Sequence, residues 1–133
     1  MKTFHLEIVT PEGAAFSGEA ESLLVRTGDG DVEILAGHTD YIATVGIGRA
    51  RVIADGKSRF ASCAGGFLTV AGGEVQLVAI TFEFREDIDL DRAEAAKAAA
   101  EAAIAAAKDI REIECAKAKL SRALSRISVA LKK

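Results

Sequence analysis

The sequence predicts a β-sandwich followed by an antiparallel pair of α-helices. All 12 glycines and the single proline lie before residue 74, whereas 15 of the 26 alanines follow residue 84. Turn residues recur every ~8–12 residues in the first part, which is typical of sandwiches and barrels. The second part lacks glycine and places apolar residues at three- and four-residue steps, which is the helical period.

The expected strands are short and separated by turns. The first alternates apolar and polar residues over 4–9 and ends at Pro11-Glu12-Gly13. The others are expected over 22–26, 32–35, 41–45, 47–54, 59–63, 67–71 and 75–82. Asp55-Gly56 and Gly72-Gly73 fit two-residue hairpin turns, because both positions of a type I′ turn need a positive φ. No helical interval separates the strands, so the sheets should be antiparallel or mixed.

The two helices are expected on either side of a weakly signalled break near 107–110. Asp87 or Asp89 can cap the first helix, whose alanines let a partner helix approach closely. The second helix carries one apolar stripe, which an antiparallel hairpin would set against those alanines. The stripe comprises Ile113, Cys115, Ala116, Leu120, Leu124, Ile127 and Leu131. Alanine buries little apolar area, so we expect a marginally packed hairpin that opens; a stable hairpin that never moves is the alternative.

The composition divides the chain into a predicted sandwich domain, residues 1–84, and a predicted helical hairpin, residues 85–133. The first has 6 basic and 11 acidic residues, and the second has 11 basic and 9 acidic. The net charge of −3 argues against a nucleic-acid binder. The longest uncharged run, 60–73, is too short and too glycine-rich to cross a membrane, and the first residues contain no signal-peptide run. These features predict a cytoplasmic protein without direct membrane insertion.

No pattern typical of an enzyme is present. There is no P-loop, and Gly46-Ile47-Gly48 meets Arg51 where a dinucleotide motif needs a third glycine. Cys63 and Cys115 stand far apart and are expected to be small buried residues. His38 alone makes no metal site, because zinc needs three or four ligands. We therefore predict no catalytic residue, no metal ligand and no required cofactor.

Five segments of the chain, taken in order, resemble a known family over essentially the whole length. They are Phe4–Pro11-Glu12-Gly13, Gly30-Asp31-Val32-Glu33-Ile34-Leu35-Ala36-Gly37-His38, Gly65-Gly66-Phe67-Leu68-x-Val70, Glu86-Asp87-Ile88-Asp89-x-x-Arg92-Ala93 and Arg122-Ala123-x-x-Arg126-Ile127-x-Val129-Ala130. The family is the epsilon subunit of the bacterial F-type rotary ATP synthase. The resemblance implies a non-catalytic rotor subunit at the cytoplasmic face of the cell membrane.

In this family the sandwich docks on the gamma subunit and on the ring of c subunits, coupling proton-driven rotation to ATP synthesis. The resemblance implies that the hairpin lies folded on the sandwich or extends toward the alpha/beta catalytic head. Extended, it inhibits ATP hydrolysis. The six Lys and Arg residues from Cys115 to Lys133, with no Asp or Glu among them, suit an acidic surface on that head.

A subset of bacterial members binds ATP on the folded hairpin, and this chain resembles them. The matching residues are Glu83, Ile88, Asp89, Arg92, Ala93, Arg122 and Arg126. Arginine forks suit phosphate oxygens, and a carboxylate can accept hydrogen bonds from ribose or the adenine amine. Ala99 stands where such members carry another arginine, so we expect weaker binding of ATP as a regulatory ligand. The alternative is a solvated face, with Asp89 as a helix cap and Arg92 as its ion-pair partner.

The loop before His38 resembles the family's ring-docking surface. The residues concerned are Glu33, Ala36, Gly37 and His38. Glu33 stands where glycine is usual, and Ala36 replaces a proline, which removes a backbone constraint. A plain solvent loop is the alternative.

Two other functions remain open at this point. One is a free-standing nucleotide-sensing module, and the other is a β-sandwich adaptor with a helical arm, unrelated to any rotary machine.

Overall fold

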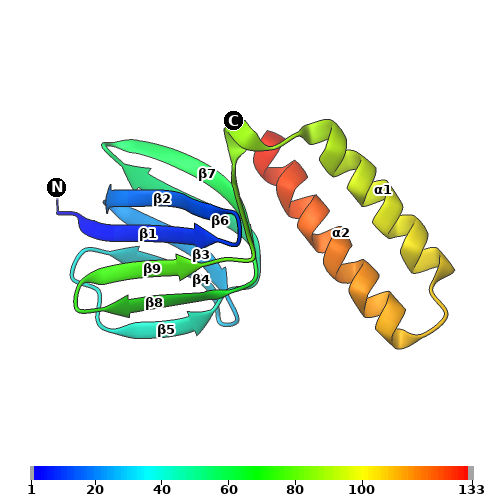
Figure 1. Ribbon diagram of the computed structural model, residues 1–133, viewed down its shortest axis with the longest axis horizontal. Coiled ribbons are helices and arrows are strands. Elements are labelled where there is room, and N and C mark those ends of the chain that lie inside the picture. The colour runs from blue at the N-terminus through cyan, green and yellow to red at the C-terminus, as the bar shows by residue number, and fades with distance from the viewer. Residues whose placement is uncertain (1, 132–133) are drawn as a thin grey trace.

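The computed structural model describes residues 2–131 and contains a β-sandwich beside a two-helix hairpin (Figure 1). Sheet A has the strand order β2-β1-β9-β8-β5, and sheet B has the order β10-β7-β6-β3-β4. The strands are β1 (Phe4–Thr10), β2 (Gly13–Ala20), β3 (Ser22–Thr27), β4 (Gly30–Leu35), β5 (Tyr41–Thr44), β6 (Ile47–Ala54), β7 (Lys57–Ala64), β8 (Phe67–Ala71), β9 (Glu74–Val78) and β10 (Thr81–Phe84). Strands β1 and β9 pair in parallel, so sheet A is mixed. The predicted fold class is confirmed.

The core lies between the two sheets. Alternate residues of β1 point into it, and Phe4, Leu6 and Ile8 are buried. Sheet B contributes its own inward row, including Leu23 and Val52. The described residues of this core run from Phe4 to Phe84, so the sandwich packs as a unit without the hairpin.

The two predicted tight turns are confirmed by their backbone angles. Asp55 and Gly56 have φ values of 52° and 74°, and Gly72 and Gly73 have 59° and 81°. Both positions of each turn are therefore in the left-handed region that a type I′ turn requires.

Two strand predictions were incomplete or wrong. Strand β2 was not expected, because its residues, with Gly18 among them, are small and show no clear alternation. It forms by pairing along β1 at the edge of sheet A. The expected strand 75–82 is two strands, since the chain leaves sheet A after β9 and enters sheet B as β10. Periodicity cannot reveal this crossing, because both halves keep the same apolar character.

The crossing after β9 meets two others at one edge of the sandwich, which we call the glycine corner (44–47, 64–67 and 78–81). The backbone N–H of Val45 donates to the Gly66 carbonyl over 2.9 Å, and that of Gly65 donates to the Gly46 carbonyl over 3.3 Å. A Cβ atom at Gly66, whose φ is 104°, would overlap the carbonyl oxygen of Val78. Only glycine satisfies both the backbone angle and the close approach.

The hairpin consists of α1 (Leu90–Ala106) and α2 (Ile110–Leu131), which follow the 3₁₀ turn η1 (Arg85–Asp87). Figure 1 shows α2 between α1 and the sandwich, and α2 contacts β6, β7 and η1. The weak break is confirmed, and hydrogen bonds of Asp109 and Glu112 mark it. Asp109 Oδ1 accepts from the Glu112 N–H over 2.8 Å, while Glu112 Oε2 accepts from the Lys108 N–H over 2.8 Å. This exchange resembles a capping box.

The predicted stripe on α2 is only partly correct. The buried residues of α2 are Ala116, Ala123, Ser125 and Val129. Leu124 and Leu131 are 44% and 60% exposed, and Cys115 is also exposed, whereas Cys63 is buried as predicted. Helix α2 contacts both α1 and the sandwich, and its buried residues are three small ones and Val129, whereas Leu124 and Leu131 are exposed.

We predict that Gly66→Ala lowers the free energy of unfolding by at least about 3 kcal/mol, through backbone strain and overlap with Val78. Gly72→Ala is the matched control. Its φ is also positive, but a Cβ atom there meets nothing within 4 Å, so a loss of about 1 kcal/mol is expected. Urea denaturation of the two variants measures both values. Equal losses would show that the corner tolerates a side chain.

Candidate functional site

Arg59 of β7 contacts the start of the linker (85–89) that joins the sandwich to the hairpin. Its guanidinium lies 3.7 Å from the centre of the Phe84 ring and donates to Glu86 Oε1 through Nε and Nη2, over 3.2 and 2.5 Å. The hydrogen bond from Arg59 holds the pKa of the Glu86 carboxyl below its ordinary value. This carboxyl therefore favours the folded linker at neutral pH, and that contribution is lost as the pH falls through the lowered pKa.

Helix α1 begins at Asp89, which is one of the two predicted caps. Asp89 Oδ1 accepts from the Arg92 backbone N–H over 3.1 Å, and the Asp89 carbonyl accepts from the Ala93 N–H over 3.0 Å. Asp87 lies in η1 instead. The predicted cap is therefore confirmed for Asp89. Within residues 2–131, no ion pair joins the side chains of Asp89 and Arg92, so that part of the alternative is wrong.

A cleft of about 520 Å³ opens where the linker, the start of α1 and the β1–β2 turn come together. Its lining residues are Thr10, Pro11, Glu12, Ile80, Thr81, Phe82, Glu83, Asp87, Asp89, Arg92, Ala93, Ala96 and Arg126. Five of the seven predicted nucleotide-binding residues are among them. Ile88 and Arg122 do not line the cleft, and neither does Ala99.

No pattern in the sequence indicates that the β1–β2 turn, with Thr10, Pro11 and Glu12, belongs to this cleft. The turn is remote in sequence from the other lining residues, and only the folded sandwich brings it to them. It adds a carboxylate that a motif search centred on Asp89 cannot find.

The charges that line the cleft are predominantly negative. Four carboxylates, from Glu12, Glu83, Asp87 and Asp89, accompany two guanidiniums, from Arg92 and Arg126. The Nε of Arg126 already donates to Glu83 Oε1 over 2.6 Å. A phosphate group that bound Arg126 would therefore have to displace Glu83 or share the guanidinium with it. In the described part of the chain, the Arg92 side chain has no acidic partner and is exposed.

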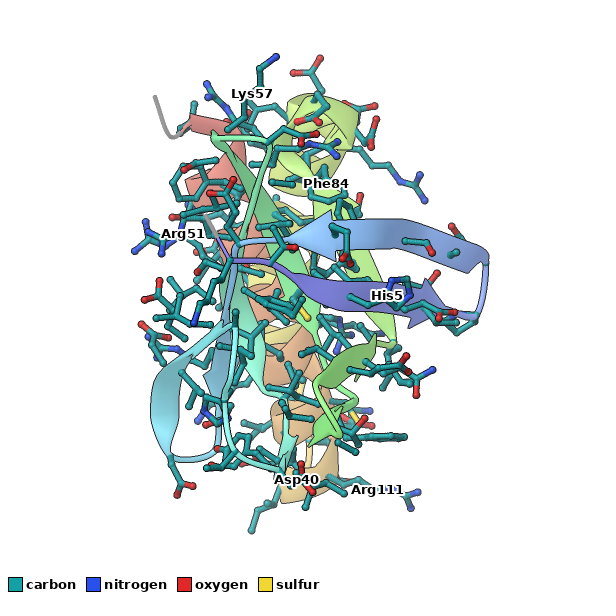
Figure 2. The ribbon with its side chains drawn as sticks, turned by 90° about the vertical axis from the view of Figure 1, so that its left-hand side faces the viewer. His5, Asp40, Arg51, Lys57, Phe84 and Arg111 are labelled. Carbon is teal, nitrogen blue, oxygen red and sulfur yellow. The ribbon has the colours of Figure 1, made fainter. Side chains whose placement is uncertain are left out.

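The residues predicted to dock on a c-ring lie in different surroundings. The Glu33 carboxylate is engaged on the face of sheet B, where it accepts from Ser22 Oγ over 3.0 Å and pairs with Arg51, labelled in Figure 2. Gly37, with a φ of 82°, and His38 form the turn after β4. Figure 2 places this end, marked by Asp40, opposite the β6–β7 turn, marked by Lys57.

Two family models cover nearly all of the chain. The model described as ATP synthase, Delta/Epsilon chain, beta-sandwich domain matches residues 3–85, and the one described as ATP synthase, Delta/Epsilon chain, long alpha-helix domain matches residues 86–130. The chain belongs to the delta/epsilon chain family of ATP synthase. The predicted family is thus confirmed, and the chain is a non-catalytic epsilon-type subunit.

Curated relatives agree with the family assignment, and a solved structure agrees with the fold. The ATP synthase epsilon chain of Bacillus velezensis is 39% identical over 130 residues, 98% of each chain, and that of Ruminococcus albus is 37% identical over 134 residues, 100% of each. A chain of the Euglena gracilis mitochondrial ATP synthase matches with a TM-score of 0.82 at 21% identity, over 98% of this chain and 82% of its own. At that identity the likeness concerns the fold alone.

The described residues of the epsilon-type chain contain neither a helix that could cross a membrane nor a cluster of side chains that could hold a metal ion. Neither helix has the length and apolar character needed to cross a membrane. No three His, Cys, Asp or Glu side chains in residues 2–131 gather in a way that could hold a metal ion.

Two polar contacts hold α2 on the sandwich of this epsilon-type chain, and we call them the polar latch. Ser62 and Glu83 lie directly opposite each other on β7 and β10. They meet consecutive residues of α2: Ser62 Oγ lies 2.9 Å from Ser125 Oγ, and Glu83 bonds Arg126. The serine pair is buried, while the ion pair is partly exposed. Neither serine was singled out in the sequence, because an isolated serine carries no pattern.

We predict that Glu83→Gln and Arg126→Gln each speed amide hydrogen exchange in α2, because either change removes the ion pair that docks this helix. A double-mutant cycle should give a coupling of about 1 kcal/mol, reduced by partial solvent screening. Glu12→Gln, in the same cleft but without a partner among the described residues, is the control and should leave exchange unchanged. Additive effects of the two substitutions would contradict the latch.

Proposed function

We propose that this chain is the central-stalk subunit that couples rotation to ATP synthesis and restrains ATP hydrolysis through a mobile hairpin. The observation that carries the proposal is the contrast between two interfaces. The sandwich closes on an apolar core of its own, whereas α2 rests on it with the polar latch at the contact. Polar contacts lose little when they exchange protein partners for water, so the hairpin can leave without exposing the core.

The proposed docking surface for gamma is the outer face of sheet A. Phe67 lies opposite Val78, which lies opposite Val9, and this row is at least partly exposed. Ile42, on the neighbouring strand, is 73% exposed, and Phe67 is 44% exposed. An apolar row of this kind on a charged chain suits a permanent subunit contact. The turn with Gly37 and His38 is the proposed contact with the c-ring, at the cytoplasmic face of the cell membrane.

The released hairpin would present its basic helix to the alpha/beta head. From Cys115 to Leu131, α2 carries four Lys and Arg residues and no Asp or Glu; Lys132 and Lys133 lie outside the described residues. Arg126 would be freed from Glu83 by release. Basic residues without neighbouring acids favour an acidic partner surface.

We expect deletion of residues from Asp87 onward to raise ATP hydrolysis by the reconstituted complex while gamma binding persists, because the sandwich core excludes the hairpin. Rates of hydrolysis and co-purification with gamma measure the two effects. Ile42→Glu is the complementary variant, which should weaken gamma binding by placing a charge beside the apolar row. Unchanged hydrolysis after the deletion would refute the inhibitory role, and unchanged binding of Ile42→Glu would refute the docking face.

A second function, sensing of ATP, is favoured by the convergence of five motif residues on one cleft. We propose that Arg92 and Arg126 bind phosphate oxygens and that Glu83 or Asp89 bonds the ribose or the adenine amine. Such a ligand would touch both helices and the sandwich, and would therefore stabilise the folded hairpin. The negative lining predicts modest affinity unless a divalent cation accompanies the nucleotide.

Calorimetric titration with ATP, with ADP as the comparison, tests this function. Saturable and ATP-selective binding should raise the melting temperature. Arg126→Gln should weaken binding about tenfold, through loss of a charge-assisted hydrogen bond. Arg111→Gln, at the remote end of α2, should not change the affinity. The absence of saturable heat at millimolar ATP would leave Asp89 as a helix cap alone.

A further inference from the structure

A second groove, of about 550 Å³, lies on the other side of the polar latch, between α2 and the face of sheet B. We call it the arginine groove. Strands β3 and β6 supply Arg26, Arg49 and Arg51, and α2 supplies Ser121, Leu124 and Ser128. Among residues 2–131, it shares no lining residue with the nucleotide cleft. It also lies on the face of the sandwich opposite the apolar row of sheet A, so neither proposed function uses it.

The groove exists because α2 covers only part of sheet B. Ser62 and Glu83, on β7 and β10, bond to α2, which also contacts β6, whereas β3 lies on the far side of β6 from β7. The uncovered part retains apolar surface. Leu24 lies on β3 directly opposite Arg51, and Leu124 projects from α2 with 44% of its surface exposed. A short apolar floor is thus bordered by guanidiniums on one side and serine hydroxyls on the other.

The groove is positively charged. Of the described residues, three arginines line it against one acid, Asp31, which accepts from Arg26 Nε over 3.1 Å. Arg51 pairs with Glu33 through Nη2, but its buried Nε has no hydrogen-bond partner among the described residues. Arg49 is exposed, and no described acid pairs with it. The chain as a whole has a net charge of −3, so this basic patch opposes the overall charge.

We propose that the arginine groove docks an acidic amphipathic segment of a partner protein. An apolar side chain of that segment would lie between Leu24 and Leu124. Its carboxylates would meet the exposed guanidinium of Arg49, and the hydroxyls of Ser121 and Ser128 would donate to the remaining acceptors. Arginine around an apolar centre is the composition that protein interfaces favour. A nucleic acid fits less well, because the floor offers leucines and the chain outside the groove is acidic.

The test uses the isotope-labelled full chain and a short helical peptide of leucine, alanine and glutamate, followed by NMR. We expect saturable shifts at 24–26, 49–51 and 121–128. Arg49→Glu should weaken binding at least about tenfold, since it replaces an attraction by a repulsion. Leu124→Ser should weaken it by removing the apolar contact. Arg111→Glu is the matched control and should bind as the wild type does, because Arg111 lies well away from Arg51 (Figure 2).

Three comparison probes decide the outcome. The same peptide with lysine in place of glutamate should not bind, and equal binding would overturn the charge argument. A peptide of glutamate and alanine without leucine should bind clearly more weakly. Equal affinity would show that the groove only attracts anions and that its apolar floor does not contribute. Tighter binding of single-stranded DNA than of the acidic peptide would overturn the choice of partner, as would the absence of any peptide shift.

Discussion

The glycine corner is the constraint on which the rest of the molecule depends. Three crossings between the sheets meet there, and Gly66 allows the chain to pass against the Val78 carbonyl. The close approach of these crossings allows β8 to lie in a different sheet from β7, and β10 in a different sheet from β9. The placement of β10 next to β7 then puts Glu83 beside Ser62. The position at which α2 docks on the sandwich therefore depends on backbone packing at the glycine corner, not on a property of the helix.

Different interactions stabilise the sandwich itself and its contact with the hairpin. The sandwich buries long aliphatic side chains on both inner faces, and this gain scales with the apolar area removed from water. The hairpin joins it through a serine pair and an ion pair, and it leaves Leu124 and Leu131 exposed. The buried apolar side chains are thus concentrated in the sandwich. The proposed release of the hairpin depends on this division, because the sandwich keeps its core when α2 leaves.

The latch also separates two recesses of opposite character. On one side lies the cleft with four carboxylates and two guanidiniums, and on the other lies the groove with three guanidiniums and one carboxylate. Arg126 lines the first, and Ser125, the next residue along α2, lines the second. Movement of α2 would therefore alter both recesses at once. A ligand in either one is linked to the position of the hairpin, since it binds only where α2 is docked.

The sequence by itself determined the fold class, because glycine and alanine are divided so sharply between the two parts and each carries its own period. It also determined local features that need no distant neighbour: the turns at Asp55-Gly56 and Gly72-Gly73 and the cap at Asp89. Asp109 and Glu112 carried a local signal too, which the lack of glycine or proline obscured.

Only the tertiary structure decided which residues become partners across long separations. It split 75–82 between two sheets, formed β2 along β1, and brought the turn at Pro11 to the cleft. It turned Arg126 toward Glu83 and buried Ser125 in place of Leu124. The reason is that these outcomes depend on how two packing units meet. A helical period predicts which residues share a face, but it does not predict which surface that face will contact.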